Sequence, residues 1–209
     1  MNKQSFLITF EGGEGCGKST QSQLFCQFLK KQNLNYFFAR EPGGTNFAEY
    51  IRMIVKDPTF EEKSLMSELL LFEAARADVM DKIVKPTLES GSIMVLDRFY
   101  DSTLAYQGYG RQMDKDVVKK LSKIATDGIV PDLTFYLKIS PEIAFERKKG
   151  KELDRFELAG LDFHKRVEQG YDEIAKENAN RFVIIDATQD KNDVHKQICE
   201  AFMERYNAR

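Results

Sequence analysis

The stretch "SFLITFEGGEGCGKST", residues 5–20, constrains the fold of this chain more than any other. Its apolar start has the length and composition of a buried β-strand, and a helical pattern begins at Ser19. The glycine-rich segment between them follows the pattern G-x-x-x-x-G-K-[ST], in which the fixed positions are Gly12, Gly17, Lys18 and Ser19. A strand, a glycine-rich loop and a helix in this order predict a phosphate-binding loop at the carboxyl end of a parallel strand.

This loop predicts a nucleoside triphosphate site. Its glycines let the backbone turn its N–H groups toward an anion, and the N-terminus of the following helix adds positive charge. We expect Lys18 to reach the β- and γ-phosphates as a catalytic group, and the Ser19 hydroxyl to ligate magnesium. The residues predicted to bind ATP are Gly12, Gly13, Glu14, Gly15, Cys16, Gly17, Lys18, Ser19 and Thr20.

The rest of the chain alternates between strand and helix patterns, which predicts an α/β fold with a parallel sheet flanked by helices. The expected strands cover residues 5–10, 35–39, 92–97, 132–139 and 181–186, and are mostly apolar on both faces, as in a buried sheet. Clear helical patterns cover residues 19–32, 65–89, 115–126 and 163–178. No linker or repeat divides the 209 residues, so we expect one domain, 1–209.

Composition excludes several classes of function. The net charge is −2, with 31% charged and 42% hydrophobic residues, so no broad basic surface indicates nucleic acid or anionic membrane as a partner. No apolar run is long enough for a signal peptide or a membrane span. The cysteines, Cys16, Cys26 and Cys199, lack metal-site spacing, and we expect reduced thiols in a cytoplasmic protein.

The loop alone does not define the reaction. The D-x-x-G and N-K-x-D motifs of GTPases do not occur in the sequence, and the third strand ends in "VLDRFYDS" rather than the paired acids of helicases and transporter ATPases. Asp97 follows a buried strand, where it can reach magnesium directly or through water. Arg98 beside it suits a second phosphorylated substrate better than simple hydrolysis, although a surface Asp–Arg ion pair is the alternative.

Five stretches in one order resemble the thymidylate kinase family, in particular its bacterial form: "EGGEGCGKST", "REPGGT", "LLFEAAR", "DRFYDSTLAYQG" and "ELDRFE". The resemblance implies the fold of P-loop nucleoside-monophosphate kinases, with a five-stranded parallel sheet and a short mobile lid at about residues 146–158. It also implies transfer of a phosphoryl group from ATP to dTMP, giving dTDP for dTTP synthesis, with Mg²⁺ as the cofactor and a homodimer as the assembly.

The resemblance assigns the acceptor site residue by residue. Arg52 and Arg98 hold the acceptor phosphate, and Arg98 is also catalytic. Phe72 stacks on thymine and Arg76 donates to a base carbonyl, and their i, i+4 spacing puts both on one helix face. Without the resemblance, Arg52 would be interpreted as a solvated helix residue and Phe72 as core.

The remaining acceptor residues follow from the same resemblance. Ser102 and Thr103 face the base edge, with Gln107 nearby. Tyr106 crowds the sugar 2′ position, and Glu14 accepts a hydrogen bond from the 3′-hydroxyl.

The predicted lid is basic, "ERKKGKELDRFE". No arginine lies between Gly12 and Lys18, so we expect a lid arginine to meet the charge of the transferred phosphoryl group. Arg155 is the first candidate and Arg147 the second. The bacterial pattern has further arginines before the lid glycine, where this chain has Lys148 and Lys149, and lysine does not replace a bidentate arginine.

Three alternatives stay open at this stage. The alternatives to a thymidylate kinase are a kinase for another nucleoside monophosphate, a nucleoside kinase, and a P-loop nucleotide-binding protein without transfer activity. Paired acceptor arginines argue against a nucleoside kinase, because a nucleoside carries no phosphate for them to bind.

Overall fold

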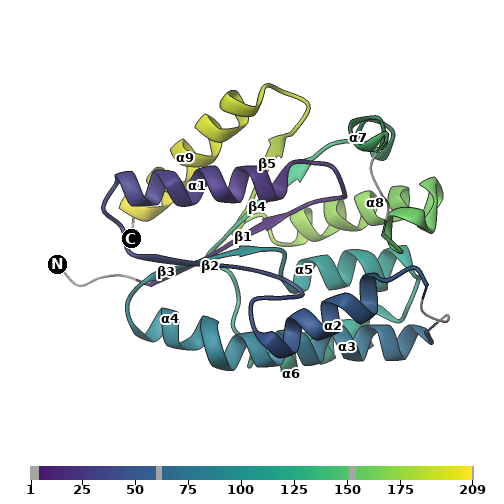
Figure 1. Ribbon diagram of the computed structural model, residues 1–209. Helices are drawn as coiled ribbons and strands as arrows, with labels where there is room; N and C mark the ends of the chain where they lie inside the picture. Colours follow the sequence, from purple (N-terminus) through teal and green to yellow (C-terminus); the bar gives the residue numbers. More distant parts are fainter. Residues whose placement is uncertain (1–4, 60–62, 151–153, 209) are drawn as a thin grey trace.

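The computed structural model describes residues 5–59, 63–150 and 154–208. These residues form a five-stranded parallel sheet with helices on both faces (Figure 1), which confirms the predicted fold class. The strand order is β2-β3-β1-β4-β5. The strands are β1 (Phe6–Glu11), β2 (Tyr36–Arg40), β3 (Ile93–Asp97), β4 (Leu133–Lys138) and β5 (Phe182–Asp186). Each begins and ends within a residue or so of the predicted range.

The central strands are buried on both faces, as their apolar sequences predict. β1 and β3 are buried along their whole length. The same prediction is wrong for the edge strands β2 and β5, on which Phe37 is 58% and Ile184 is 54% exposed. A row of aromatic residues shows that a strand is apolar, but it does not show whether a helix covers both of its faces.

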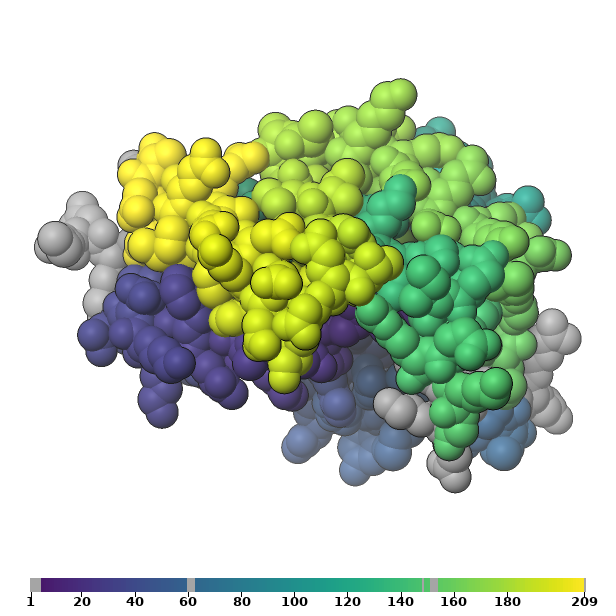
Figure 2. All heavy atoms as spheres, turned by 90° about the horizontal axis from the view of Figure 1, so that it is seen from above, coloured from purple at the N-terminus to yellow at the C-terminus, as the bar shows by residue number. Residues whose placement is uncertain are grey.

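One face of the sheet is covered by α1 (Lys18–Lys31) and α9 (Lys191–Asn207), which lie side by side in Figure 2. Aromatic side chains fill this layer. The ring of Phe25 on α1 lies 5.7 Å from Phe10 on β1 and 5.1 Å from Phe202 on α9. This packing fixes α1, and with it the loop that connects β1 to α1.

The opposite face carries the longer helical segments. The helix predicted over residues 65–89 is one continuous segment that widens to a π-helix in the middle, while α2 and α6 pack on its first part. The elements on this side are α2 (Asn46–Lys56), α3 (Leu65–Val79), η1 (Met80–Val84), α4 (Lys85–Glu89), α5 (Tyr100–Thr103), η2 (Leu104–Gly110), α6 (Lys115–Ala125) and α8 (Leu161–Glu177). Two short elements, α7 (Pro141–Lys148) and η3 (Glu157–Ala159), overlap the two ends of the predicted lid, about 146–158, whose residues 151–153 lie outside the described residues. None of the described helices is both long and apolar enough to cross a membrane.

Strand register brings the predicted site segments to one edge of the sheet. Phe10 on β1 and Arg40 on β2 are both register partners of Asp97 on β3. Since the strands are parallel, the chain leaves all three at the same edge, where ligands of such sheets bind.

The packing of α8 against η2 generates a stability prediction. A Cβ atom at Gly170 would lie 2.7 Å from Cγ of Tyr109. Alanine normally stabilises a helix relative to glycine, but here overpacking dominates, so we expect Gly170→Ala to lower the free energy of unfolding by about 1–3 kcal/mol. Urea unfolding followed by circular dichroism measures it. Gln169→Ala, an exposed neighbour, should change stability by less than about 0.5 kcal/mol. A Gly170→Ala variant as stable as the parent would contradict this packing.

Candidate active site

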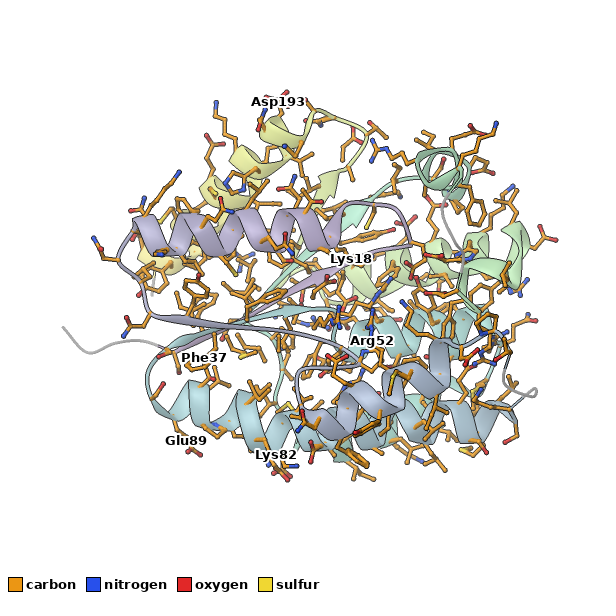
Figure 3. All side chains as sticks on the ribbon, viewed as in Figure 1. Lys18, Phe37, Arg52, Lys82, Glu89 and Asp193 are labelled. Carbon is orange, nitrogen blue, oxygen red and sulfur yellow. The ribbon has the colours of Figure 1, made fainter. Side chains whose placement is uncertain are left out.

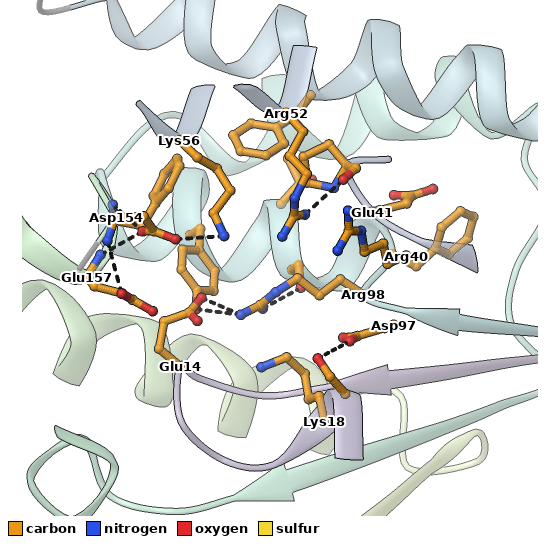
Figure 4. A pocket seen from close by; sticks show the side chains of 18 of the residues that line it. Glu14, Lys18, Arg40, Glu41, Arg52, Lys56, Asp97, Arg98, Asp154 and Glu157 are labelled. Atoms are coloured by element: carbon orange, nitrogen blue, oxygen red, sulfur yellow. Dashed lines mark hydrogen bonds and ion pairs between the residues drawn. The ribbon is translucent and has the colours of Figure 1, made fainter. Parts of the chain in front are cut away.

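A cavity of about 540 Å³ opens at this edge of the sheet (Figure 4). Most of the predicted site residues line it together, although they come from six parts of the chain. They are Glu14, Gly15, Gly17, Lys18, Ser19, Thr20, Arg52, Phe72, Arg76, Asp97, Arg98, Ser102, Thr103, Tyr106, Gln107 and Arg147. Gly12, Gly13 and Cys16 belong to the loop but are not among the lining residues, and neither is Arg155.

The loop has the backbone that its glycines predict. Gly12 has φ 141° and Gly17 has φ 92°, values that a residue with a Cβ rarely adopts. The Lys18 ammonium turns back along the loop and donates to the carbonyl oxygens of Gly12, at 3.1 Å, and Gly13, at 2.6 Å. Both Lys18 on α1 and Arg52 on α2 line the cavity, on two different sides of it (Figure 3).

The two predicted metal ligands lie together. Ser19 Oγ donates to Asp97 Oδ2 at 2.6 Å, at the point where α1 begins and β3 ends. A hydroxyl and a carboxylate beside a phosphate loop fit Mg²⁺, which prefers oxygen ligands and completes its octahedron with water and substrate phosphates.

Arg98 holds the centre of the cavity. Its backbone has φ 73°, an uncommon conformation for a residue other than glycine. One terminal nitrogen, Nη2, donates to Glu14 Oε1 at 2.5 Å and to Tyr106 OH at 3.1 Å. The other, Nη1, donates to the carbonyl oxygen of Gly12 at 3.0 Å and to Ser102 Oγ at 3.1 Å. The arginine thus joins the phosphate loop to the segment after β3.

Three arginines gather near this point (Figure 4). Arg52 donates to the carbonyl oxygen of Pro42 at 2.9 Å. Burial and the charges of Arg40 and Arg98 lower the pKa of Arg52. Like charges that lower the pKa of an arginine in a partly buried site are compensated when an anion binds between them. The arrangement therefore indicates a second anion site, opposite the phosphate loop.

At the far end of the cavity an aromatic pair faces a buried arginine. Phe72 lies 5.7 Å from Phe156, ring centre to ring centre. Arg76 is ion-paired with Glu41 at 2.8 Å and with Glu73 at 2.7 Å, and it donates to Thr103 Oγ1 at 2.8 Å. Burial raises the pKa of Glu41 to about 7, against the opposing effect of Arg76. The Phe72 ring lines the cavity with the fixed donors of Arg76 close by, and an apolar ring beside fixed donors suits a nucleobase.

The predicted lid arginines take different positions. Arg147 lines the cavity and donates to the carbonyl oxygen of Ala187 at 2.9 Å. Arg155 instead pairs with Glu68 and donates to the carbonyl oxygen of Val55 at 3.2 Å. These contacts connect Arg155 to α2 and α3. Its predicted role at the phosphates stays a prediction.

Ser102 and Gln107 also contact neighbours that the sequence did not indicate. Ser102 lies beneath Arg98 rather than free at a base edge, since it donates to Glu11 Oε2 at 2.5 Å. Gln107 donates to Glu68 at 3.0 Å. Both residues line the cavity as predicted.

The sequence did not lead us to predict two buried carboxylates and one aromatic ring at the site. Glu41 and Glu73 hold Arg76, and Phe156 faces Phe72. Glu41 and Glu73 could have been predicted, because they stand in the quoted motifs "REPGGT" and "LLFEAAR", each with an arginine close by in the sequence. Phe156 follows a charged run that reads as solvent-exposed, so its burial carries little local signal.

Comparison with known proteins decides the family. The family profile described as thymidylate kinase matches residues 10–198. The chain belongs to the thymidylate kinase family. Among similar thymidylate kinases, that of Chlorobium limicola is 43% identical over 96% of this chain and 95% of its own length. That of Dehalococcoides mccartyi is 43% identical over 93% of both chains. The crystal structure of the thymidylate kinase from Ehrlichia chaffeensis superposes with a TM-score of 0.80, at 33% identity over 95% of this chain and 99% of that one.

The buried ion pairs of Arg76 with Glu41 and Glu73 should contribute strongly to the stability of this thymidylate kinase family member. Glu73→Ala leaves Arg76 buried with one of its two carboxylates, so we expect the free energy of unfolding to fall by about 3–5 kcal/mol. Glu49→Ala breaks the exposed pair with Arg40 and should cost less than about 1 kcal/mol. Urea unfolding of both variants provides the comparison, and equal losses would show that burial does not set the strength of these pairs.

Proposed function

We propose that this chain transfers the γ-phosphoryl group of ATP to dTMP, giving dTDP for dTTP synthesis. The observation that carries the proposal is the second anion site: Arg52 faces Lys18 of the phosphate loop across one cavity, and Arg98 lies between them (Figure 4). A hydrolase needs one phosphate site, whereas a kinase for a phosphorylated acceptor needs two in line. Membership of the thymidylate kinase family identifies the acceptor as dTMP.

On the donor side, the backbone N–H groups of residues 12–20 bind the ATP phosphates, and Lys18 releases its loop carbonyls to reach the β- and γ-phosphates. Ser19 and Asp97 hold the Mg²⁺ ion, which neutralises phosphate charge. Arg147 is the lid arginine best placed for the phosphoryl group, because it already lines the cavity. Residues about 146–158 serve as the lid of a single domain, 1–209.

On the acceptor side, Arg52 and Arg98 bind the dTMP phosphate and hold it in line with the γ-phosphate. Phe72 stacks on thymine, and Phe156 supports the Phe72 ring by packing edge-on against it. Arg76 and Thr103 read the base edge, and their mutual hydrogen bond fixes the direction of the arginine. Glu14 accepts from the 3′-hydroxyl, and Tyr106 excludes a 2′-hydroxyl by occupying its space.

The decisive experiment is an ADP-release assay with a panel of acceptors: dTMP, dCMP, dGMP, AMP, thymidine and none. We expect kcat/KM for dTMP to exceed that for each other acceptor by at least about a hundredfold, since the wrong base leaves buried polar groups unpaired. Lys18→Ala, checked for native circular dichroism, controls for contaminating kinases. Equal turnover with AMP or dCMP would indicate a different nucleotide kinase, preference for thymidine would indicate a nucleoside kinase, and no acceptor-dependent release would indicate a binding protein.

The proposal extends to the assembly and the compartment. The cysteines, Cys16, Cys26 and Cys199, are all free, which suits the reducing cytoplasm. Two helices that pack together expose large apolar side chains, and a second copy of this chain would cover them. They are Phe47, Tyr50 and Met53 on α2, and Leu65, Met66 and Leu70 on α3. Large apolar side chains exposed on two helices that pack together are typical of homodimer interfaces.

A charge within this surface should prevent assembly. We expect the parent chain to sediment as a dimer and the double variant Tyr50→Glu, Leu70→Glu to sediment as a folded monomer, because two carboxylates would have to be buried on association. Ile184→Glu, which adds a charge on the edge strand β5 at similar exposure, should leave the dimer intact. Sedimentation velocity distinguishes the two states. A monomeric parent, or a dimeric double variant, would contradict the proposed interface.

A further inference from the structure

Glu11 is a buried carboxylate that the mechanism above does not use. It is the last residue of β1, its exposed fraction is 0%, and it is not among the residues that line the cavity. Burial, followed by the charge of Asp101, raises the pKa of Glu11 to about 7. Asp101 is paired with Arg181 through two hydrogen bonds of 2.7 and 2.8 Å, so that arginine is already committed to another acid. The contacts of Glu11 lead instead toward Arg98.

The first link between Glu11 and Arg98 runs through the backbone. The N–H group of Phe99 donates to Glu11 Oε1 at 2.7 Å. Phe99 directly follows Arg98, whose φ of 73° needs support from its surroundings. The carboxylate therefore holds the peptide that sets the direction in which Arg98 leaves the sheet.

The second link runs through two hydroxyls. Ser102 and Tyr171 donate to the same oxygen, Glu11 Oε2, at 2.5 and 2.9 Å. The two hydroxyls also lie 2.8 Å from each other. A hydroxyl has one hydrogen to donate, so each hydroxyl that donates to Glu11 keeps its lone pairs for other donors. Arg98 Nη1 donates to these two hydroxyls at 3.1 and 3.3 Å. The carboxylate thus makes both hydroxyls acceptors for the guanidinium.

An amide cannot replace the carboxylate in both links. If the NH₂ group of a glutamine faces Ser102 and Tyr171, the hydroxyls accept from it. That uses lone pairs which Arg98 needs, and it frees the hydroxyl hydrogens to point at one another or at Arg98, which has only donors. If the NH₂ group faces Phe99, two donors meet there. In either orientation one link to Arg98 is lost, while the size of the side chain stays the same.

We propose that Glu11 is a positioning residue for the acceptor phosphate, acting on Arg98 through the Phe99 backbone and the hydroxyls of Ser102 and Tyr171. The inference rests on the proposed function in assigning Arg98 to the dTMP phosphate. It adds a residue outside the cavity that determines how well this arginine tells a nucleotide from a nucleoside.

The test compares two ligands that differ only in the phosphate. Isothermal titration calorimetry gives the affinities of the Glu11→Gln variant and the parent for dTMP, for thymidine and for ATP. We expect the variant to bind dTMP at least about tenfold more weakly, because a charge-assisted contact is misaligned, and to bind thymidine and ATP within about twofold of the parent. The ratio of dTMP affinity to thymidine affinity therefore falls.

Glu73→Gln is the matched control. It changes another buried carboxylate, at the base end, and should weaken dTMP and thymidine together, leaving their ratio unchanged. If Glu11→Gln fails to fold, Tyr171→Phe removes one hydroxyl link and should lower the ratio by about threefold.

The outcomes separate this inference from the function on which it rests. A parent that binds thymidine as tightly as dTMP would overturn the assignment of Arg98 and the inference together. A parent that prefers dTMP, with a folded variant whose ratio is unchanged, would overturn only the role of Glu11.

Discussion

The hydrogen bonds of the Arg98 guanidinium join the two halves of the active site. On one side they reach Gly12 and Glu14 of the phosphate loop, and on the other Ser102, Tyr106 and Tyr171. The loop is fixed by the packing of α1 on the sheet, and the acceptor pocket by η2 and α8. One planar cation with a fixed fork of donors spans both, so under the proposed function the fold rather than the substrates sets the distance between the donor and acceptor phosphates.

The charges in the cavity are arranged by the depth at which they lie. Deep arginines are paired with carboxylates, as Arg76 is with Glu41 and Glu73, and they orient rather than attract. Arg52 lies among like charges instead, since Arg40 and Arg98 lower its pKa, and this favours an arriving anion. An arginine paired with carboxylates therefore serves to orient a ligand, whereas an arginine among like charges serves to attract an anion.

The sequence predicted the phosphate loop and the sheet well because both depend on local patterns. The loop needs glycines at fixed spacing, and parallel strands need short apolar runs. The exposure of Phe37 on β2 could not be predicted in this way, because strand order is decided by contacts between distant segments. The position of Ser102 beneath Arg98 was missed for the same reason, since its partner Glu11 lies 91 residues away in the chain.

Other residues required the resemblance or the structure itself. Arg52 looks like any solvated residue of an amphipathic helix until the fold brings it opposite Lys18. Glu11 ends an apolar strand, and nothing in the sequence indicates that its oxygens accept from α5, from α8 and from the backbone N–H of Phe99 between β3 and α5. Arg155 stands in a basic run that suggests phosphate contact, whereas its partner Glu68 is supplied by α3.

The central claim is that two phosphate sites face each other within one cavity. A compound in which adenosine and thymidine are joined through five phosphates occupies both sites at once, and its affinity measures their alignment most directly. Calorimetry should show binding at least about a hundredfold tighter than that of ATP or dTMP alone, because the second half binds intramolecularly. An affinity no greater than that of ATP would contradict the claim, since it would mean that the two sites are not in line.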